Sequence, residues 1–259
     1  MWYSVTQRIR SVQQPRGGYI PSKNMTKTEL DDTKVGIKKK LNERENIQPV
    51  SMGLVVDYLT RFMISHNAVE SFKISLLGAM IVHEKKYAVC ELSKIKGLDD
   101  ESIKAACKLV GFDVYFRTGN TGWNKNYGCL PDPDKNTIEN IRIMVNRSIQ
   151  FFEEYGPLVV DGFTFEGGYT SIIGSGDGDF ITEDTLWDFK VSKNNPTSAH
   201  TLQLFIYWRM GLHSIHKEIF EKIQYLGIYN PRLNIVYRIS VTDIPLEYVE
   251  EVDSEVIGY

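Results

Sequence analysis

The stretch from Asp177 to Tyr207 constrains the fold most, because it contains two strand-like segments close together. The first segment holds Asp179 and the apolar pair Phe180-Ile181, and the second is the apolar-rich run 186–191. Residues 182–185 form a polar connection short enough for a hairpin turn. Asp188 and Lys190 are two residues apart, so on a strand both side chains leave the same face. The sequence therefore predicts a hairpin that brings Asp179 and Asp188 together, with Lys190 beside them.

This set of side chains suits a hard divalent cation. Two carboxylates are ligands that Mg²⁺ or Mn²⁺ prefers, and the backbone carbonyl of Phe189 is a further oxygen ligand. Such a cation is a Lewis acid and provides an activated nucleophile. Lys190 would orient or deprotonate a water molecule, or stabilise negative charge that develops on phosphorus. The residues thus predict hydrolysis of a phosphodiester bond.

The remaining periodicity predicts an α+β protein with an N-terminal helical part and a C-terminal sheet that carries the acids. Helices are predicted over residues 52–63, 72–79, 103–110, 138–155 and 201–212. Strands are predicted over residues 114–116, 158–160, 163–165, 169–173, 223–228 and 234–241, and a long loop over 119–134. The acids therefore lie in the second half of the chain.

Charge is spread unevenly along the 259 residues, although the net charge is only −3. Residues 1–44 contain ten lysines and arginines against four acids, whereas residues 243–259 contain six acids and no base. We expect residues 1–47 to be a basic, loop-rich leader that either follows a phosphate backbone or is simply solvated. No apolar run is long enough to span a bilayer, and the N-terminus lacks the apolar core of a signal peptide. The expected location is cytoplasmic, with no membrane partner.

Four segments resemble, in order, the motifs of the PD-(D/E)xK nuclease superfamily and its RecB-like exonuclease branch. They are Gly53 to Asp57, Gly176-Asp177-Gly178-Asp179, Trp187-Asp188-Phe189-Lys190 and the Q-x-x-x-Y segment from Gln203 to Tyr207. The resemblance implies an α/β/α restriction-endonuclease-like core, with a central mixed β-sheet flanked by helices. It also implies a single nuclease-like domain over residues 48–259, with an inserted helical segment at 85–155.

The resemblance assigns a role to each matching side chain. Asp179 and Asp188 would be metal ligands, Lys190 would be catalytic, and Gln203 with Tyr207 would position the substrate or the catalytic strand. The implied activity is that of a Mg²⁺- or Mn²⁺-dependent deoxyribonuclease of exonuclease type. Its partner would be DNA, with a recombination or helicase protein as a further partner in a phage or DNA-repair setting.

Asp57 marks a departure from the family pattern. The early helix of that family often presents a histidine, whereas this chain has Asp57 at the matching position. Asp57 would then complete the metal site. The alternative is an ion pair on the helix surface, because Arg61 follows four residues later. Glu153 and Glu154 are alternative sources of a third acid.

Other metal chemistry is not expected. Some relatives in the family hold an iron-sulfur cluster with four cysteines, but this chain has only Cys90, Cys107 and Cys129, and none of them follows Lys190. The histidines at 200, 213 and 216 follow no metal-binding spacing, so we expect them to pack or to lie on the surface.

Two other functions use the same residues differently. One is a nuclease-like protein without catalytic activity that binds nucleic acid or inhibits another protein. The other is a small-molecule phosphohydrolase on a different fold, which shares the metal chemistry but has no motif of its own here. Metal binding and DNA cleavage distinguish these functions from the nuclease.

Overall fold

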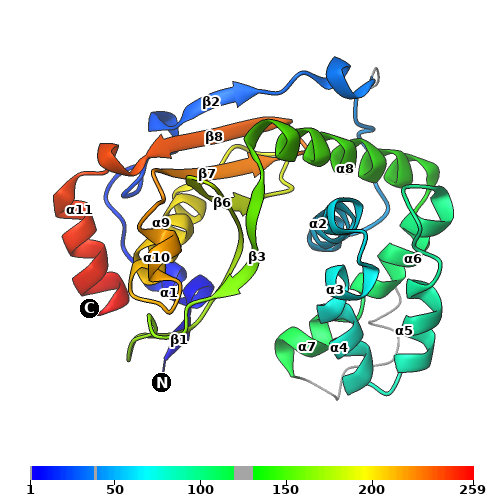
Figure 1. Ribbon diagram of the computed structural model, residues 1–259, viewed down its shortest axis with the longest axis horizontal. Helices are drawn as coiled ribbons and strands as arrows, with labels where there is room; N and C mark the ends of the chain where they lie inside the picture. The colour runs from blue at the N-terminus through cyan, green and yellow to red at the C-terminus, as the bar shows by residue number, and fades with distance from the viewer. Residues whose placement is uncertain (1, 38–39, 120–130) are drawn as a thin grey trace. The chain divides into compact units, whose positions relative to one another are not determined.

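The computed structural model describes residues 2–37, 40–119 and 131–259. It divides into a sheet unit, made of Met1–Leu30 and Phe151–Tyr259, and a helical unit, made of Asp31–Gln150. Helix α8 (Lys135–Tyr155) begins in the helical unit and ends in the sheet unit (Figure 1). Cys129 and most of the expected loop at 119–134 lie outside the described residues.

The sheet unit is built around one mixed sheet of six strands, which agrees with the central mixed sheet that the resemblance implies. Their order is β2 (Thr26–Glu29), β8 (Ile235–Ser240), β7 (Tyr225–Asn230), β6 (Thr185–Phe189), β5 (Asp177–Thr182) and β3 (Leu158–Thr164). β6 and β7 are parallel, and the other neighbouring strands are antiparallel. The strand that carries Asp188 therefore lies inside the sheet, where its backbone is fixed from both sides.

The two faces of the sheet hold different apolar clusters, because successive side chains on a strand alternate between faces. Leu186 and Leu226 pack into the larger cluster, together with helix α9 (Ser198–Leu212). Trp187 and Tyr229 pack on the opposite face, against Phe151 near the end of α8. Alternation then places Asp188 on the face that α9 covers.

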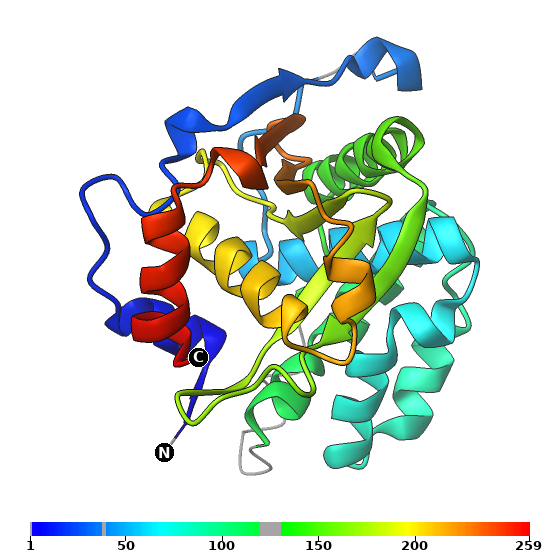
Figure 2. The same cartoon turned by 60° about the vertical axis from the view of Figure 1, so that its left-hand side comes forward.

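The two ends of the chain lie beside α9. The N-terminal strand β1 (Tyr3–Ser4) pairs in parallel with β4 (Ile173–Ser175) and leads into α1 (Val5–Ser11). Figure 2 shows α1 and the C-terminal helix next to α9. The side chain of Arg8 on α1 donates from Nε to the carbonyl of Val256 at 2.9 Å. The shorter elements of this unit are η1 (Ser22–Asn24), α10 (Lys217–Phe220), η4 (Val241–Asp243), α11 (Leu246–Glu251) and a π-helical turn (Val252–Ile257).

The helical unit contains every described helix between residues 31 and 134. They are η2 (Asp32–Val35), α2 (Pro49–Ser65), α3 (Ala68–Ser71), α4 (Lys73–Ile81), α5 (Lys85–Leu92), α6 (Asp100–Val110) and α7 (Asp113–Thr118). Asp99 caps α6 by accepting hydrogen bonds from the backbone of Glu101 and Ser102, each at 3.0 Å. Asp100 and Glu101 lie in the first turn, where negative charge suits the helix dipole.

Three local predictions are wrong. Residues 114–116 were expected to be extended because they are aromatic and β-branched, but they belong to α7. Asp113 at the start of α7 is buried and accepts hydrogen bonds from Ser75 and Tyr58, each at 2.5 Å, which holds the chain in place there. Residues 158–160 and 163–165 were expected to form two strands, but a single strand, β3, covers most of them. Of the strand expected at 169–173, only Ile173 lies in one.

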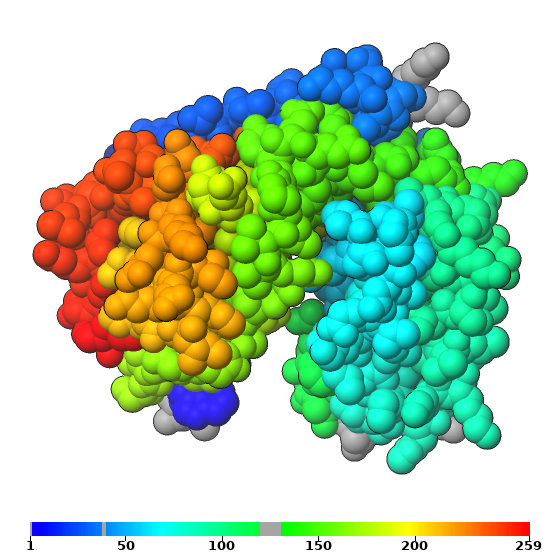
Figure 3. Space-filling model, viewed as in Figure 1, coloured from blue at the N-terminus to red at the C-terminus, as the bar shows by residue number. Residues whose placement is uncertain are grey.

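Residues 2–30 include several regular elements. They contribute β1 and α1, and their strand β2 pairs with β8 from Thr26 opposite Arg238 to Glu29 opposite Ile235. In Figure 3 the medium-blue residues along the top, which include β2, lie beside the orange-red residues that include β8. The expected division into a leader (1–47) and a nuclease-like domain (48–259) stays a prediction, although the two units have other boundaries.

None of the helices in the described ranges combines the length and the apolar character that crossing a bilayer requires.

Candidate active site

The hairpin that the sequence predicts is present and forms the centre of the candidate site. β5 and β6 are antiparallel, with Phe180 opposite Trp187 and Ile181 opposite Leu186. One further step in this register sets Asp179 opposite Asp188. Opposite residues in an antiparallel pair share a face, so both carboxylates lie on the face that α9 covers.

Asp188 and Lys190 form a close ion pair. The Nζ of Lys190 lies 2.8 Å from Oδ1 of Asp188, and the two side chains are 26% and 2% exposed. This contact confirms that the two side chains share a face. The ammonium group therefore compensates part of the charge of a carboxylate that is almost completely removed from water.

The second oxygen of Asp188 has no such compensation. Within the described part of the chain, Oδ2 of Asp188 is buried and accepts no hydrogen bond. Burial raises the pKa of Asp188 above its usual value, Lys190 opposes this rise, and the charge of Asp179 adds to it. A buried carboxylate oxygen without a donor is the arrangement that a metal ion would satisfy.

Lys190 stays protonated in this environment. Burial lowers its pKa, but the charges of Asp188, Asp179 and Asp177 and the hydrogen bond to Asp188 together raise it by more, so the pKa lies above its usual value. Lys190 is therefore a cation and a hydrogen-bond donor at neutral pH. Of the roles expected from the sequence, orienting water and stabilising negative charge fit this state better than deprotonating water.

Asp179 is held by the neighbouring strand. Its Oδ2 accepts a hydrogen bond from the backbone N–H of Phe189 at 2.7 Å. This bond joins the two strands next to Asp188 and aligns the Asp179 carboxylate along the same face. No sequence pattern indicates this bond, because the donor is a backbone group whose position depends on the strand register.

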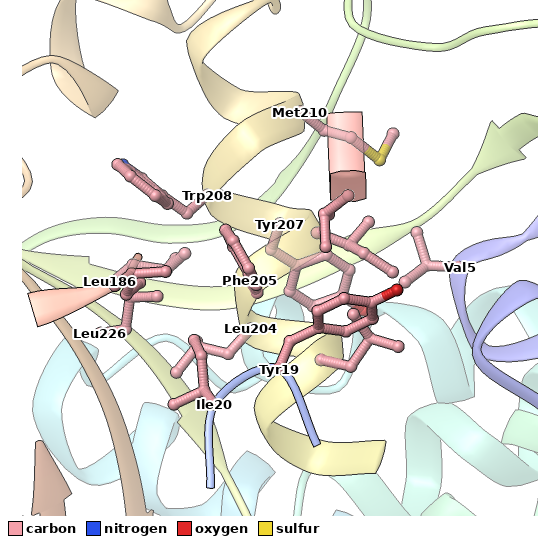
Figure 4. Close-up of a cluster of buried hydrophobic side chains, with 14 of the residues drawn as sticks. Val5, Tyr19, Ile20, Leu186, Leu204, Phe205, Tyr207, Trp208, Met210 and Leu226 are labelled. Carbon is pink, nitrogen blue, oxygen red and sulfur yellow. The ribbon is translucent and has the colours of Figure 1, made fainter. Parts of the chain in front are cut away.

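Helix α9 brings Gln203 and Tyr207 together on one face, as their spacing predicts. The Nε2 of Gln203 donates to the hydroxyl of Tyr207 at 2.8 Å. The ring of Tyr207 is buried and stacks on Phe165 with a centroid separation of 5.1 Å. Figure 4 shows Tyr207 within the apolar cluster, next to residues from α9 and the N-terminal segment.

The carboxylates near the hairpin also affect the pKa of Tyr207. Burial raises its pKa well above the usual value, the hydrogen bond to Gln203 opposes this rise, and Asp188, Asp177 and Asp179 add to it. Tyr207 therefore stays protonated near the candidate site. Tyr207 thus packs in the apolar cluster and also lies close enough to the acids for their charges to affect its pKa.

Asp57 belongs to the helical unit and has an ion-pair partner there. The Nε of Arg61 donates to Oδ1 of Asp57 at 2.8 Å, and the two side chains are 20% and 23% exposed. This is the ion pair on the surface of the early helix that the spacing predicts as the alternative. A metal-binding role for Asp57, and likewise for the carbonyl of Phe189, stays a prediction.

No group of three or more histidine, cysteine, aspartate or glutamate side chains in the described ranges is arranged to hold a metal ion. The histidines have other contacts. His200 accepts a hydrogen bond from the backbone of Thr197 through Nδ1 at 3.3 Å, and His213 stacks on Tyr259 at 3.8 Å. Glu153 and Glu154 are exposed near the end of α8. A cation in the sheet unit would therefore rely on Asp179, Asp188 and backbone or solvent oxygens.

The glycines before Asp179 have a packing reason that their spacing alone did not reveal. A Cβ on Gly178 would lie 2.2 Å from the ring of Phe163, and one on Gly176 would lie 2.8 Å from Val5. These contacts bring strand β3 and the N-terminal helix directly against the segment that carries Asp179. The sequence signal was the glycine run itself, whose contacts come from distant parts of the chain.

No protein-family model, curated protein or solved structure matches the chain. The resemblance to PD-(D/E)xK nucleases stays a prediction that rests on the motifs and on the geometry of the hairpin.

Proposed function

We propose that this protein is a metal-dependent deoxyribonuclease with a restriction-endonuclease-like core. One observation carries the proposal: Oδ2 of Asp188 is buried without a hydrogen-bond donor, while Oδ1 is paired with Lys190 and Asp179 lies on the opposite strand. Leaving a buried acceptor unpaired costs about 1–3 kcal/mol, and more for a charged group. This unpaired oxygen lowers the stability of the fold, so a role in binding a cation explains it better than a role in stabilising the fold.

The residues of the hairpin fit Mg²⁺ or Mn²⁺. Asp188 would bind the cation through Oδ2, Asp179 would be the second carboxylate ligand, and the carbonyl of Phe189 would be an oxygen ligand from the chain between them. When bound, the cation would supply a Lewis acid beside the phosphate group. No iron-sulfur cluster is proposed.

The side chains around this position have complementary tasks. Lys190 remains charged and would stabilise the negative charge that develops on the phosphate oxygens during cleavage. Its ion pair with Asp188 fixes the direction of the ammonium group. Tyr207 holds the amide of Gln203, and this pair would position the substrate or the hairpin. We further propose the RecB-like exonuclease type, with a recombination or helicase protein as partner.

A cleavage assay tests the proposal. The purified full chain, incubated with Mg²⁺ or Mn²⁺, is expected to degrade DNA, and Asp188→Asn and Lys190→Ala are expected to abolish the activity. Glu183→Gln is the matched control, since Glu183 is exposed in the turn of the same hairpin. Circular dichroism would establish that all three variants are folded.

The results of this assay separate the nuclease from its alternatives. DNA binding without cleavage under any divalent cation would favour the inactive, nucleic-acid-binding protein. Metal-dependent hydrolysis of small phosphodiesters combined with no attack on DNA would favour the phosphohydrolase. Cleavage that survives both Asp188→Asn and Lys190→Ala would place the activity elsewhere in the chain.

A further inference from the structure

A cavity of about 510 Å³ opens in the N-terminal loop of the sheet unit. No residue of the β5–β6 hairpin lines it. Its lining consists of Arg16, Gly17, Pro21, Ser22 and Lys23. Arg16 and Lys23 are exposed, and neither has a hydrogen bond or an ion pair within the described residues. Two uncompensated cations therefore border one concave surface.

The loop that forms this cavity is fixed against the start of α9. Gly17 and Gly18 have φ values of +92° and +91°, which residues with a side chain rarely adopt. A Cβ on Gly18 would lie 2.6 Å from the Cβ of Ser198. Thr201 on α9 donates from Oγ1 to the carbonyl of Ile20 at 2.7 Å. Figure 4 shows Tyr19 and Ile20 lying beside α9.

The start of α9 also adjoins the candidate active site. Lys190 is followed by a short connection, 191–197, that leads directly into α9. This connection is held to the sheet by hydrogen bonds of 2.8 Å each, from Asn230 to the carbonyl of Ser192 and from Tyr237 to Asn195. The charge of Lys190 reaches His200 in the first turn of α9, where burial and that charge lower the pKa of His200. The loop that forms the cavity therefore contacts the start of α9, and the chain runs from Lys190 into that same start of the helix.

We propose that this cavity binds a backbone phosphate of the DNA strand that is cleaved at Asp188 and Lys190. This inference rests on the proposed function. Arg16 and Lys23 supply charge and hydrogen-bond donors, and the positive end of the α9 dipole adds to the attraction for an anion. Pro21 offers an apolar wall to the sugar. Contacts of this kind position a strand without reading its sequence.

Binding measured without metal tests the proposal independently of cleavage. The double variant Arg16→Gln/Lys23→Gln would be titrated against a fluorescent single-stranded oligonucleotide in EDTA at several salt concentrations. We expect the slope of log Kd against log salt to become shallower by about 0.7, and Kd at 0.15 M salt to rise about fourfold, since one phosphate contact contributes about 0.7 to the slope.

Two further variants make the result specific. Lys217→Gln/Lys222→Gln removes the same charge from exposed positions of the sheet unit outside this cavity, and it is expected to leave the slope nearly unchanged. Ser22→Asp keeps both cations but adds a negative charge to the cavity lining, and it is expected to weaken binding as the double variant does.

The proposal is overturned if the slope of Arg16→Gln/Lys23→Gln equals that of the wild type, or if the control variant changes the slope equally. It is also overturned if the wild type does not bind the oligonucleotide, or if inorganic phosphate binds as tightly as the oligonucleotide. A wild-type protein that binds with the expected slope but never cleaves DNA with Mg²⁺ or Mn²⁺ would contradict the nuclease assignment while supporting the phosphate site.

Discussion

Asp179 and Lys190 do not contact each other directly but act on the same carboxylate, Asp188. Asp179 lies opposite Asp188 in the hairpin and raises its pKa, whereas Lys190 pairs with its Oδ1 at 2.8 Å and lowers it. Burial outweighs the effect of Lys190, so Asp188 ionises at a higher pH than an ordinary aspartate. A divalent cation would change this balance by taking the unpaired oxygen.

Removing Lys190 is expected to destabilise the metal-free protein in a pH-dependent way. Lys190→Met leaves the Asp188 carboxylate buried without its partner, which costs about 3 kcal/mol when the carboxylate is charged. At pH 5 the carboxyl group can take up a proton, so the loss should be smaller than at pH 8. Urea unfolding at both pH values measures the loss in the free energy of unfolding. The control is Lys217→Met, because Lys217 forms an exposed ion pair with Glu221. An equal loss at the two pH values would contradict the account.

Asp188 itself should make the metal-free protein more stable in mild acid. Its folded-state pKa of about 6 lies above the ordinary value of 3.8, so the folded state binds the proton more tightly than the unfolded chain. The stability due to this proton is complete below the unfolded pKa and is lost as the pH rises through about 6. Between about pH 4 and pH 8, the free energy of unfolding of the wild type should therefore fall by about 2–3 kcal/mol more than that of Asp188→Asn. Parallel curves for the two proteins would show that Asp188 is not perturbed.

Gly178 should tolerate no side chain while Phe163 is present. The Cβ of Gly178→Ala would lie 2.2 Å from the Phe163 ring, which also packs against Phe165 and Phe220. We expect a loss of about 2 kcal/mol in the free energy of unfolding, in the range of other overpacked cores. Gly178→Ala combined with Phe163→Leu should lose less than the sum of the two single changes. Strict additivity in thermal or urea unfolding would exclude the clash.

Much of the site could be predicted from the sequence because its determinants are local. The two-residue spacing of Asp188 and Lys190, the short turn before them and the four-residue spacing of Gln203 and Tyr207 each follow from strand or helix geometry. These side chains meet as predicted. The resemblance to the nuclease family added roles for them, which remain to be tested.

The contacts that sequence reasoning missed join residues far apart in the chain. Tyr3 pairs with Ile173 and Thr26 with Arg238, so the register of these strands depends on partners that no local pattern identifies. Local propensity also failed at residues 114–116, where the buried hydrogen bonds of Asp113 support a helix despite strand-forming side chains. Tertiary contacts overrode intrinsic preference in that segment.

Tyr207 is expected to support cleavage through Gln203. Tyr207→Phe keeps the buried ring and its stacking on Phe165 but removes the oxygen that accepts from Gln203. We expect a decrease of about tenfold in kcat, which corresponds to about 1.4 kcal/mol, with little change in Mn²⁺ affinity. Single-turnover cleavage together with a Mn²⁺ titration would separate the two effects. A loss of Mn²⁺ binding in Tyr207→Phe would instead make the tyrosine part of the metal site.

Mn²⁺ binding by the full chain tests the central claim most directly. Isothermal titration calorimetry, with electron paramagnetic resonance of free Mn²⁺ as a second readout, would compare the wild type with Asp188→Asn and with the control Glu183→Gln. The account predicts that wild type and Glu183→Gln bind Mn²⁺ alike, and that Asp188→Asn binds at least about tenfold more weakly. Equal Mn²⁺ binding by wild type and Asp188→Asn, or no binding by the wild type, would contradict it.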